Sequence, residues 1–200
     1  MSKRNAILDA ATQLFSRNGF NETSMADLSV ITGAARGTIF HHFKNKEDLF
    51  LNILENARQT ILSAFQTHKN QARYATGLEK VEGVITFYLS FAGERADLFL
   101  LLHRHSPYQI AETNSDCRSC LESIYTCLLD MFEDGISTGI SDGSIRPCAP
   151  RNTAMIIFAM ADGVTRLDTY HLYHAGSLYG DLITACKKIL ANEQGSQCAP

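Results

Sequence analysis

Residues 33–50 read GAARGTIFHHFKNKEDLF. With a helical period, Ala35, Ile39 and Phe43 share one face of a short helix, which predicts that this face packs on neighbouring helices. A polar break follows, and Asn45 is expected to cap a longer helix that begins KEDLFLNIL. The stretch therefore predicts a short helix with an apolar face, followed closely by a long helix.

The opposite face of the short helix carries hydrogen-bonding groups. Gly37, Thr38 and His41 point outward, with Arg36 and Phe40 on the flank. A glycine there costs about 1 kcal/mol of helix propensity, but it allows another surface to approach the backbone closely. Arginine can hydrogen-bond a guanine edge or a phosphate, and threonine can reach a phosphate or a thymine methyl group. This face predicts that the helix lies on a nucleic acid duplex.

Two short helices are expected upstream. Apolar residues at positions 7, 8, 11, 14 and 15 predict a first helix that Gly19 ends. The pattern Ser24-x-x-Asp27 predicts a capping-box start for a second helix, which Gly33 ends. The expected buried stripe of this helix is Met25, Leu28 and Ile31. Three short helices, the second and third joined by a tight glycine turn, predict a helix-turn-helix, although ordinary bundle helices can show the same pattern.

Composition sets the wider frame. The 200 residues are 45% hydrophobic, enough for a core, and no apolar run approaches the length that spans a membrane. The first 46 residues carry six basic and three acidic side chains, a net charge of +3, whereas the whole chain carries −3. This asymmetry points to an anionic partner for the N-terminal part. The six cysteines are expected to be reduced thiols in a cytoplasmic protein.

The remainder of the chain also has helical periodicity, so the predicted fold class is all-α. One apolar stripe runs from Val81 to Phe91 and another from Leu121 to Phe132. The segment SDGSIRPCAP predicts a loop before two final helices. We expect a DNA-binding domain over 1–48, a larger helical domain over 49–192 and a tail over 193–200.

The segment TSMADLSVITGAARGTIFHHFKNKEDL resembles the DNA-binding signature of the TetR (tetracycline-repressor-like) family of bacterial transcriptional regulators. The match covers about residues 5–50. It departs from the family at Ala35, where a capping serine is common, and at Phe40, which lacks the usual tyrosine hydroxyl. The resemblance implies a homodimer that binds a partly palindromic operator, usually as a repressor that a small ligand releases. The DNA contacts implied by the motif fall on Thr23, Ser24, Arg36, Thr38, Phe40, His41 and Lys46.

A regulator of this kind needs a dimer face and a ligand pocket. The last two helices offer apolar stripes, Leu182, Ile183, Cys186, Ile189 and Leu190 on one and Ala154, Ile157, Phe158 and Ala161 on the other, which also suit packing within the subunit. Candidate ligand-binding residues are aromatic or polar groups on apolar helices, and these also fit a plain core: Phe87, Phe91, His103, Tyr108, Tyr125, Met155 and Asp162. Asp162 is the most distinctive, and its simplest partner is Arg166, four residues on.

Other classes of function have weaker support. Cys117-x-x-Cys120 can place two thiolates on one helix face, which leaves a thiol- or metal-sensing regulator of the same fold as the alternative. Structural zinc takes four ligands, and the sequence has only one such pair, so we expect no metal. The chain has no glycine-rich phosphate loop, no GxSxG and no HExxH, so neither an enzyme nor a cofactor is expected.

Overall fold

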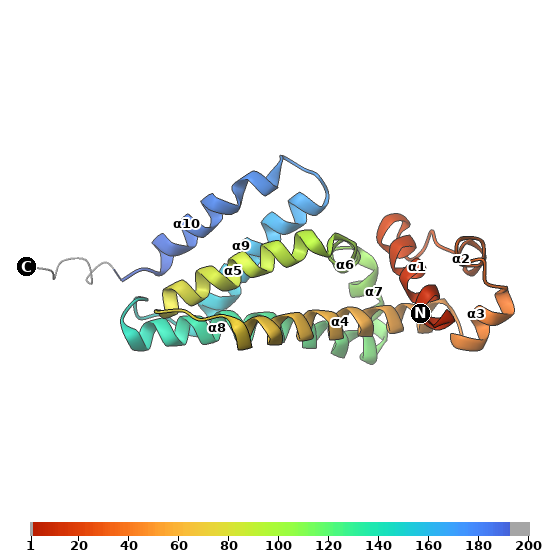
Figure 1. The fold of residues 1–200 in the computed structure, drawn as a ribbon, viewed down its shortest axis with the longest axis horizontal. Helices are drawn as coiled ribbons and strands as arrows, with labels where there is room; N and C mark the ends of the chain where they lie inside the picture. Colours follow the sequence, from red (N-terminus) through yellow and green to blue (C-terminus); the bar gives the residue numbers. More distant parts are fainter. Residues whose placement is uncertain (1, 193–200) are drawn as a thin grey trace, which may run out of the picture. The chain divides into compact units, whose positions relative to one another are not determined.

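The computed structural model describes residues 2–192, and these residues form an all-α fold, as the periodicity predicted (Figure 1). The elements are α1 Lys3–Asn18, α2 Met25–Thr32, α3 Arg36–His42, α4 Lys46–Gln71, α5 Gly77–Glu94, α6 Ala96–Leu102, α7 His105–Thr113, α8 Ser115–Asp142, α9 Pro150–Thr169, the 3-10 helix η1 Ala175–Leu178 and α10 Tyr179–Leu190. Extended pairing within the described residues is limited to an isolated bridge between Ile145 and Ala191. The predicted tail at 193–200 lies outside the described residues.

Two compact units divide the chain. The first contains the chain up to Ser63 together with Arg95–Ile124, and the second contains Ala64–Glu94 and the described chain from Tyr125 onward. Helices α4 and α8 each contribute residues to both units.

The first unit is built around α1, which packs on α2, α3 and α6. Its core holds three phenylalanines, Phe15, Phe20 and Phe50, whose ring centroids are 5.1–5.7 Å apart. Edge-on and tilted contacts at this distance are the favoured geometry for aromatic pairs. This cluster fixes the start of α4 against α1, and it thereby sets the position of the short helices between them.

In the second unit, α10 packs on α5 and α9, and Figure 1 shows α9 and α10 joined by the loop that contains η1. The predicted stripe on α5 is confirmed, because Val81, Val84, Ile85, Tyr88 and Phe91 are all buried. The predicted stripe on α8, whose first two residues belong to the first unit, is confirmed in the same way: Leu121, Ile124, Leu128, Met131 and Phe132 are buried.

Most residues of the apolar stripes on the last two helices pack within their own unit. On α9, Ala154, Ile157 and Ala161 are fully buried and Phe158 is 9% exposed; on α10, Leu182, Cys186 and Leu190 are buried as well. Ile189 of the α10 stripe is 36% exposed, so a partner subunit could meet this residue and residues outside the stripes. Within residues 2–192, no helix is both long enough and apolar enough to cross a lipid bilayer.

Candidate nucleic-acid interface

The second and third helices form a tight helix-turn-helix. Helix α2 ends at Gly33, which adopts the left-handed conformation at φ 64° and ψ 8°. A side chain there would be strained, and the glycine lets the chain reverse within three residues. The Ser29 hydroxyl donates to the carbonyl of Ala34 at 2.7 Å, and the amide of Ala34 donates to the Thr32 hydroxyl at 3.2 Å. These bonds fix the angle at which α3 leaves α2.

Helix α3 has two distinct faces, as its sequence predicted. Ile39 and Phe43 are buried at 0% and 1% exposure. The guanidinium of Arg4 lies 5.3 Å from the centre of the Phe43 ring, which adds a cation–π contact to the apolar packing. Ala35 is an exception to the prediction: it is exposed because it precedes the helix as the N-cap and has no place in the apolar face.

The outward face of α3 carries the predicted contact residues. Arg36, Gly37 and His41 are exposed, Thr38 is half-buried and Phe40 is 47% exposed. A Cβ atom added to Gly37 would meet no other atom within 4 Å, so the backbone is open to an approaching surface there. The structure thus brings five of the eight predicted contact residues onto one short helix.

Two of the other three predicted contact residues, Thr23 and Lys46, stabilise the loop before α2. Thr23 is 1% exposed, and its hydroxyl donates to the Gly19 carbonyl at 2.9 Å. The ammonium of Lys46 donates to the carbonyls of Phe20 at 2.9 Å and Thr23 at 3.1 Å, and it lies 4.4 Å from the centre of the Phe20 ring. Lys46 therefore holds the loop against α4 in this structure. If Lys46 also contacted a DNA phosphate, its ammonium would have to bind the phosphate and the loop carbonyls together.

Ser24 begins α2 with the predicted capping box. Its hydroxyl accepts from the amide of Asp27 at 3.2 Å, and the Asp27 carboxylate accepts from the Ser24 amide at 2.8 Å. The hydrogen bonds from Ser24 lower the pKa of the exposed Asp27 carboxyl below its usual value. The expected stripe of α2 is wrong at Ile31, which is 57% exposed, because an eight-residue helix resting on α1 and α3 buries Leu28 alone.

Arg104 contributes to this unit and was missed by the sequence reasoning. Its Nε and Nη2 atoms donate to the Ser16 carbonyl at 2.9 and 2.8 Å, and Nη2 also donates to the Arg17 carbonyl. A guanidinium at the C-terminal end of α1 satisfies carbonyls that have no partner within the helix and complements the helix dipole. No local sequence pattern predicts this contact, because Arg104 lies 88 positions from Ser16 and 87 positions from Arg17.

The predicted ligand-binding residues fall in both units. In the second unit, Phe87 and Phe91 stack at 5.9 Å between ring centroids, and Phe65 contacts both rings. A separate group forms where the Tyr88 hydroxyl donates to the Asp162 carboxylate at 2.6 Å, so Asp162 has a partner other than the expected Arg166.

The rings of Tyr125 and Tyr88 both contact Phe158, which brings Tyr125 into the Asp162 group. Met155 on α9 is 52% exposed. In the first unit, His103 is 3% exposed and Tyr108 is 39% exposed. None of these contacts identifies a ligand, so the seven ligand-binding residues stay a prediction.

Cys117 and Cys120, the predicted thiol pair, are ill suited to sensing. Cys117 and Cys120 are free, and burial raises the pKa of each thiol to about 11, with the charges of Glu47 and Glu55 adding to the effect. Thiols with so high a pKa stay protonated at neutral pH and are poor nucleophiles and poor metal ligands. Among the described residues, no group of three or more His, Cys, Asp or Glu side chains could hold a metal ion. The thiol- or metal-sensing alternative has no support from this geometry.

A helix-turn-helix with an outward polar face is the arrangement that many DNA-binding transcriptional regulators use. Comparison with known proteins agrees with this class. Residues 7–53 match the family of bacterial regulatory proteins described as the tetR family. The chain is 35% identical over 80 residues to the HTH-type transcriptional regulator QacR of Staphylococcus aureus, a match that covers 40% of this chain and 42% of QacR. Residues 7–53 of the chain therefore belong to the TetR family of bacterial transcriptional regulators.

Two further comparisons extend over most of the chain. The fatty acid metabolism regulator protein of Bacillus subtilis is 24% identical over 140 residues, which cover 70% of this chain and 69% of that protein. The crystal structure of FadR from Bacillus subtilis in complex with stearoyl-CoA superposes with a TM-score of 0.73 at 21% identity, covering 92% of this chain and 98% of that chain. At this identity, the structural likeness establishes a shared fold.

Proposed function

We propose that the protein is a homodimeric repressor that binds a palindromic operator through α3 and is released by a small molecule. The observation that carries the proposal is the division of α3 into a buried side, held by Ile39 and Phe43, and an exposed polar side. Packing explains the buried side. The exposed side is not part of this packing, and its donors suit base edges and phosphates.

The contacts we assign differ in kind. Arg36 reads a guanine edge or holds a phosphate, Thr38 and His41 contact the same groove, and Gly37 lets the backbone approach. Phe40 makes an apolar contact. Ser24 presents the N-terminus of α2 to a phosphate, an arrangement that favours anions. Thr23 and Lys46 support the loop beside that helix end, as their hydrogen bonds to the carbonyls of Gly19 and Phe20 suggest.

For the dimer, we assign the exposed side of α9. Met155 and Ile156 are 52% and 58% exposed, and the small residues Ala159 and Gly163 follow on the same helix and are exposed too. Exposed apolar side chains beside small residues suit close packing of a helix against its symmetry mate. On α10, Ile189 is 36% exposed and can extend this face.

Binding of a small effector is supported by a structural neighbour, a FadR regulator whose crystal structure is a complex with stearoyl-CoA. The predicted residues Phe87, Phe91, Tyr125 and Asp162, with His103, Tyr108 and Met155, remain the candidates for effector contact in the helical domain. Because α4 carries residues of both units, we propose that the effector tilts α4. The tilt would move the two α3 helices of a dimer away from the spacing of about 34–36 Å, one turn of DNA, that a two-fold operator requires.

The test is fluorescence anisotropy with the duplex upstream of the protein's own gene, across a salt series. We expect tight binding that resists random competitor DNA and weakens as salt rises, because phosphate contacts release counterions. Replacing Arg36 with alanine should weaken binding by about 1–3 kcal/mol, the value of a good base contact. Arg118→Gln removes one positive charge from an exposed position on α8 and serves as the control for the loss of charge alone.

A selection from random duplexes extends the test if the operator lies elsewhere. Recovery of a partly palindromic sequence whose binding depends on Arg36 would support the proposal. If no duplex is enriched, or if Arg36→Ala and Arg118→Gln weaken binding equally, the DNA-binding role of α3 is refuted.

A further inference from the structure

The second unit contains a pocket of about 280 Å³ that lies between the C-terminal end of α4, the loop before α5, α5 and α8. None of the ligand-binding residues predicted from the sequence lines it. The residues around it are His68, Lys69, Ala72, Arg73, Tyr74, Ala75, Thr76, Lys80, Val84, Met131, Asp134 and Thr138. This volume is near the lower end of the range for small-molecule sites, about 300–1,000 Å³, so the pocket suits a small ligand.

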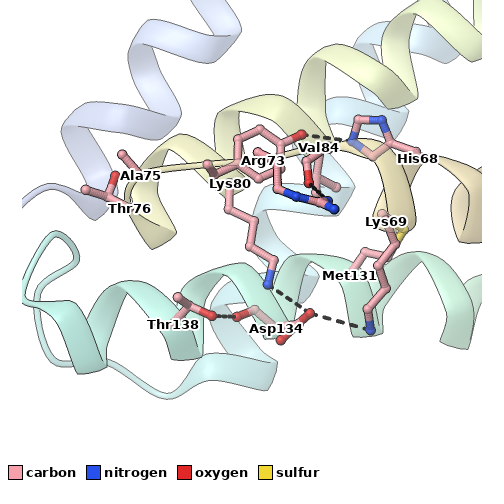
Figure 2. Close-up of a pocket in the computed structure, with 12 residues that line it drawn as sticks. His68, Lys69, Arg73, Ala75, Thr76, Lys80, Val84, Met131, Asp134 and Thr138 are labelled. Carbon is pink, nitrogen blue, oxygen red and sulfur yellow. Dashed lines mark hydrogen bonds and ion pairs between the residues drawn. The ribbon is translucent and has the colours of Figure 1, made fainter.

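The charges around the pocket do not balance. Lys80 and Lys69 both pair with the Asp134 carboxylate, at 3.0 and 3.7 Å between nitrogen and oxygen. Figure 2 shows the two lysines reaching Asp134 from different sides. Arg73 adds a third cation, which donates to the carbonyls of Asn70 and Ala72 at the end of α4, and within the described residues it pairs with no carboxylate. Three cations thus face one anion, an excess of positive charge that favours an anionic ligand.

The two other titratable groups of the pocket are neutral. The Tyr74 hydroxyl and Nε2 of His68 are hydrogen-bonded at 2.9 Å. Burial lowers the pKa of the His68 imidazole and raises the pKa of the Tyr74 phenol, so neither carries a charge at neutral pH. The imidazole of His68 also stacks on Phe87 at 4.1 Å. This side of the pocket is therefore an aromatic wall.

The aromatic wall depends on a glycine. A Cβ atom on Gly83 of α5 would lie 2.2 Å from the Tyr74 hydroxyl, so only glycine lets the tyrosine lie against this helix. Val84 and Met131, at 2% and 9% exposure, provide the apolar floor. The pocket accordingly combines a cationic rim with an apolar interior.

We propose that this pocket binds a small amphiphilic anion, a carboxylate or a phosphate monoester on a short apolar body. The anionic group takes Lys80, Lys69 and Arg73, and the apolar body lies against Val84 and Met131. In binding, the anion competes with Asp134 for Lys69, which belongs to α4, and so loosens the ion pair between α4 and α8. This consequence rests on the proposed function, in which α4 transmits the effector signal; the binding site itself does not.

The experiment is isothermal titration calorimetry of the full-length protein, without DNA, against four probes that share an eight-carbon chain: octanoate, octyl phosphate, octan-1-ol and octylamine. We expect saturable binding of octanoate, octyl phosphate or both, and much weaker binding of the alcohol and the amine. The comparison of the two anions shows which head group the site takes. Equal binding of octanol and the anions, or no binding of either anion, would overturn the proposal.

Variants locate the binding. Lys80→Gln combined with Arg73→Gln should reduce anion affinity roughly tenfold, as two lost ion pairs of partly exposed type would. Asp134→Asn should raise the affinity for the anion, because it removes the carboxylate that competes with the anion for Lys69 and Lys80. Arg118→Gln, which removes one positive charge at an exposed position outside the pocket, should leave the affinity unchanged, and circular dichroism shows whether each variant is folded. Equal effects of the pocket variants and the control would overturn the assignment.

The experiments distinguish a failure of the pocket proposal from a failure of the proposed function. If the anion binds through Lys80 and Arg73 but no duplex is selected by the protein, then operator binding is refuted and the site stands. If a selected operator is bound and neither anion binds the protein, the pocket is refuted and the regulator stands.

Discussion

Helices α2 and α3 are neighbours of similar length, yet different interactions stabilise them. Helix α2 begins with a full capping box between Ser24 and Asp27, and α3 begins at Ala35 with no side-chain cap. Helix α2 buries only Leu28, whereas α3 and its C-cap bury Ile39 and Phe43. Helix α2 is therefore stabilised mainly by the capping box at its N-terminus, and α3 mainly by the burial of Ile39 and Phe43.

This difference is useful for a helix that must contact another molecule. The buried side chains of Ile39 and Phe43 hold α3 in place, so the exposed side chains of this helix are not needed for packing. Arg36, Gly37 and His41 can then serve recognition at little cost in stability. Four predictions test this division between end-stabilised and core-stabilised helices, and they run from the largest expected effect to the smallest.

Phe43→Ala should have the largest effect. The ring is 1% exposed, and replacing a buried phenylalanine by alanine costs about 3–5 kcal/mol of the free energy of unfolding. Urea denaturation followed by circular dichroism measures the loss. Phe40→Ala, on the exposed side of the same helix, is the control and should cost far less. Equal losses would mean that α3 does not rest on Phe43.

Lys46→Met should rank second. It keeps the aliphatic stem and removes an ammonium that bonds to the carbonyls of Phe20, Asn21 and Thr23. The loss should be about 1–3 kcal/mol of the free energy of unfolding, as for hydrogen bonds to a charged group. Lys44→Met, at an exposed position, is the matched control. If Lys46→Met weakens DNA binding while stability is unchanged, Lys46 acts on phosphate and not on the loop.

Opposite changes at the two caps should have opposite effects. Ser24→Ala should destabilise the protein by about 1 kcal/mol, and Ala35→Ser should stabilise it by up to about the same amount, because serine is a good N-cap and alanine a poor one. Thermal unfolding of both variants and of the double variant gives the comparison. A destabilising Ala35→Ser would show that the start of α3 cannot accept a capping geometry.

The smallest effect is the pH dependence of the α2 cap. Hydrogen bonds from Ser24 lower the pKa of Asp27 in the folded protein. A lowered folded-state pKa gives stability that is present above the unfolded value, near 3.8, and lost as the pH falls through the folded value. The difference in thermal midpoint between wild type and Asp27→Asn should therefore be constant near neutral pH and shrink in acid. The pKa of Asp142 is lowered too, but its contribution is common to both proteins and cancels. A difference that grows in acid would contradict this reasoning.

Much of the first fifty residues could be predicted because their structure is encoded locally. Gly19 ends α1, Ser24 caps α2, and the side chain of Asn45 accepts from the amide of Asp48 at 2.8 Å to start α4. Each signal acts within four residues of its partner, so a linear pattern contains it. The polar face of α3 was predictable for the same reason: Ile39 and Phe43 are four residues apart and set the orientation of the rest.

Longer-range features could not be predicted in this way. Periodicity showed that α9 carries an apolar stripe, but not that its own unit covers Ala154 and Ile157 and leaves Met155 exposed. Asp162 was expected to pair with Arg166, and the structure adds Tyr88, 74 positions away. Local patterns report that a group needs a partner. They do not report which of several compatible partners the fold brings to it.

The sequence by itself determined the first four helices, the caps of α2 and α4 and the outward face of α3, because these depend on backbone hydrogen bonds and on side chains within one or two turns. Only the tertiary structure decided where Arg104 bonds and how Lys69, Lys80 and Asp134 meet around one pocket. Lys69, Lys80 and Asp134 come from three separate helices and Arg104 from the turn before α7, so their contacts depend on how the helices pack against one another. Packing is cooperative over the chain, so no short stretch of sequence contains it.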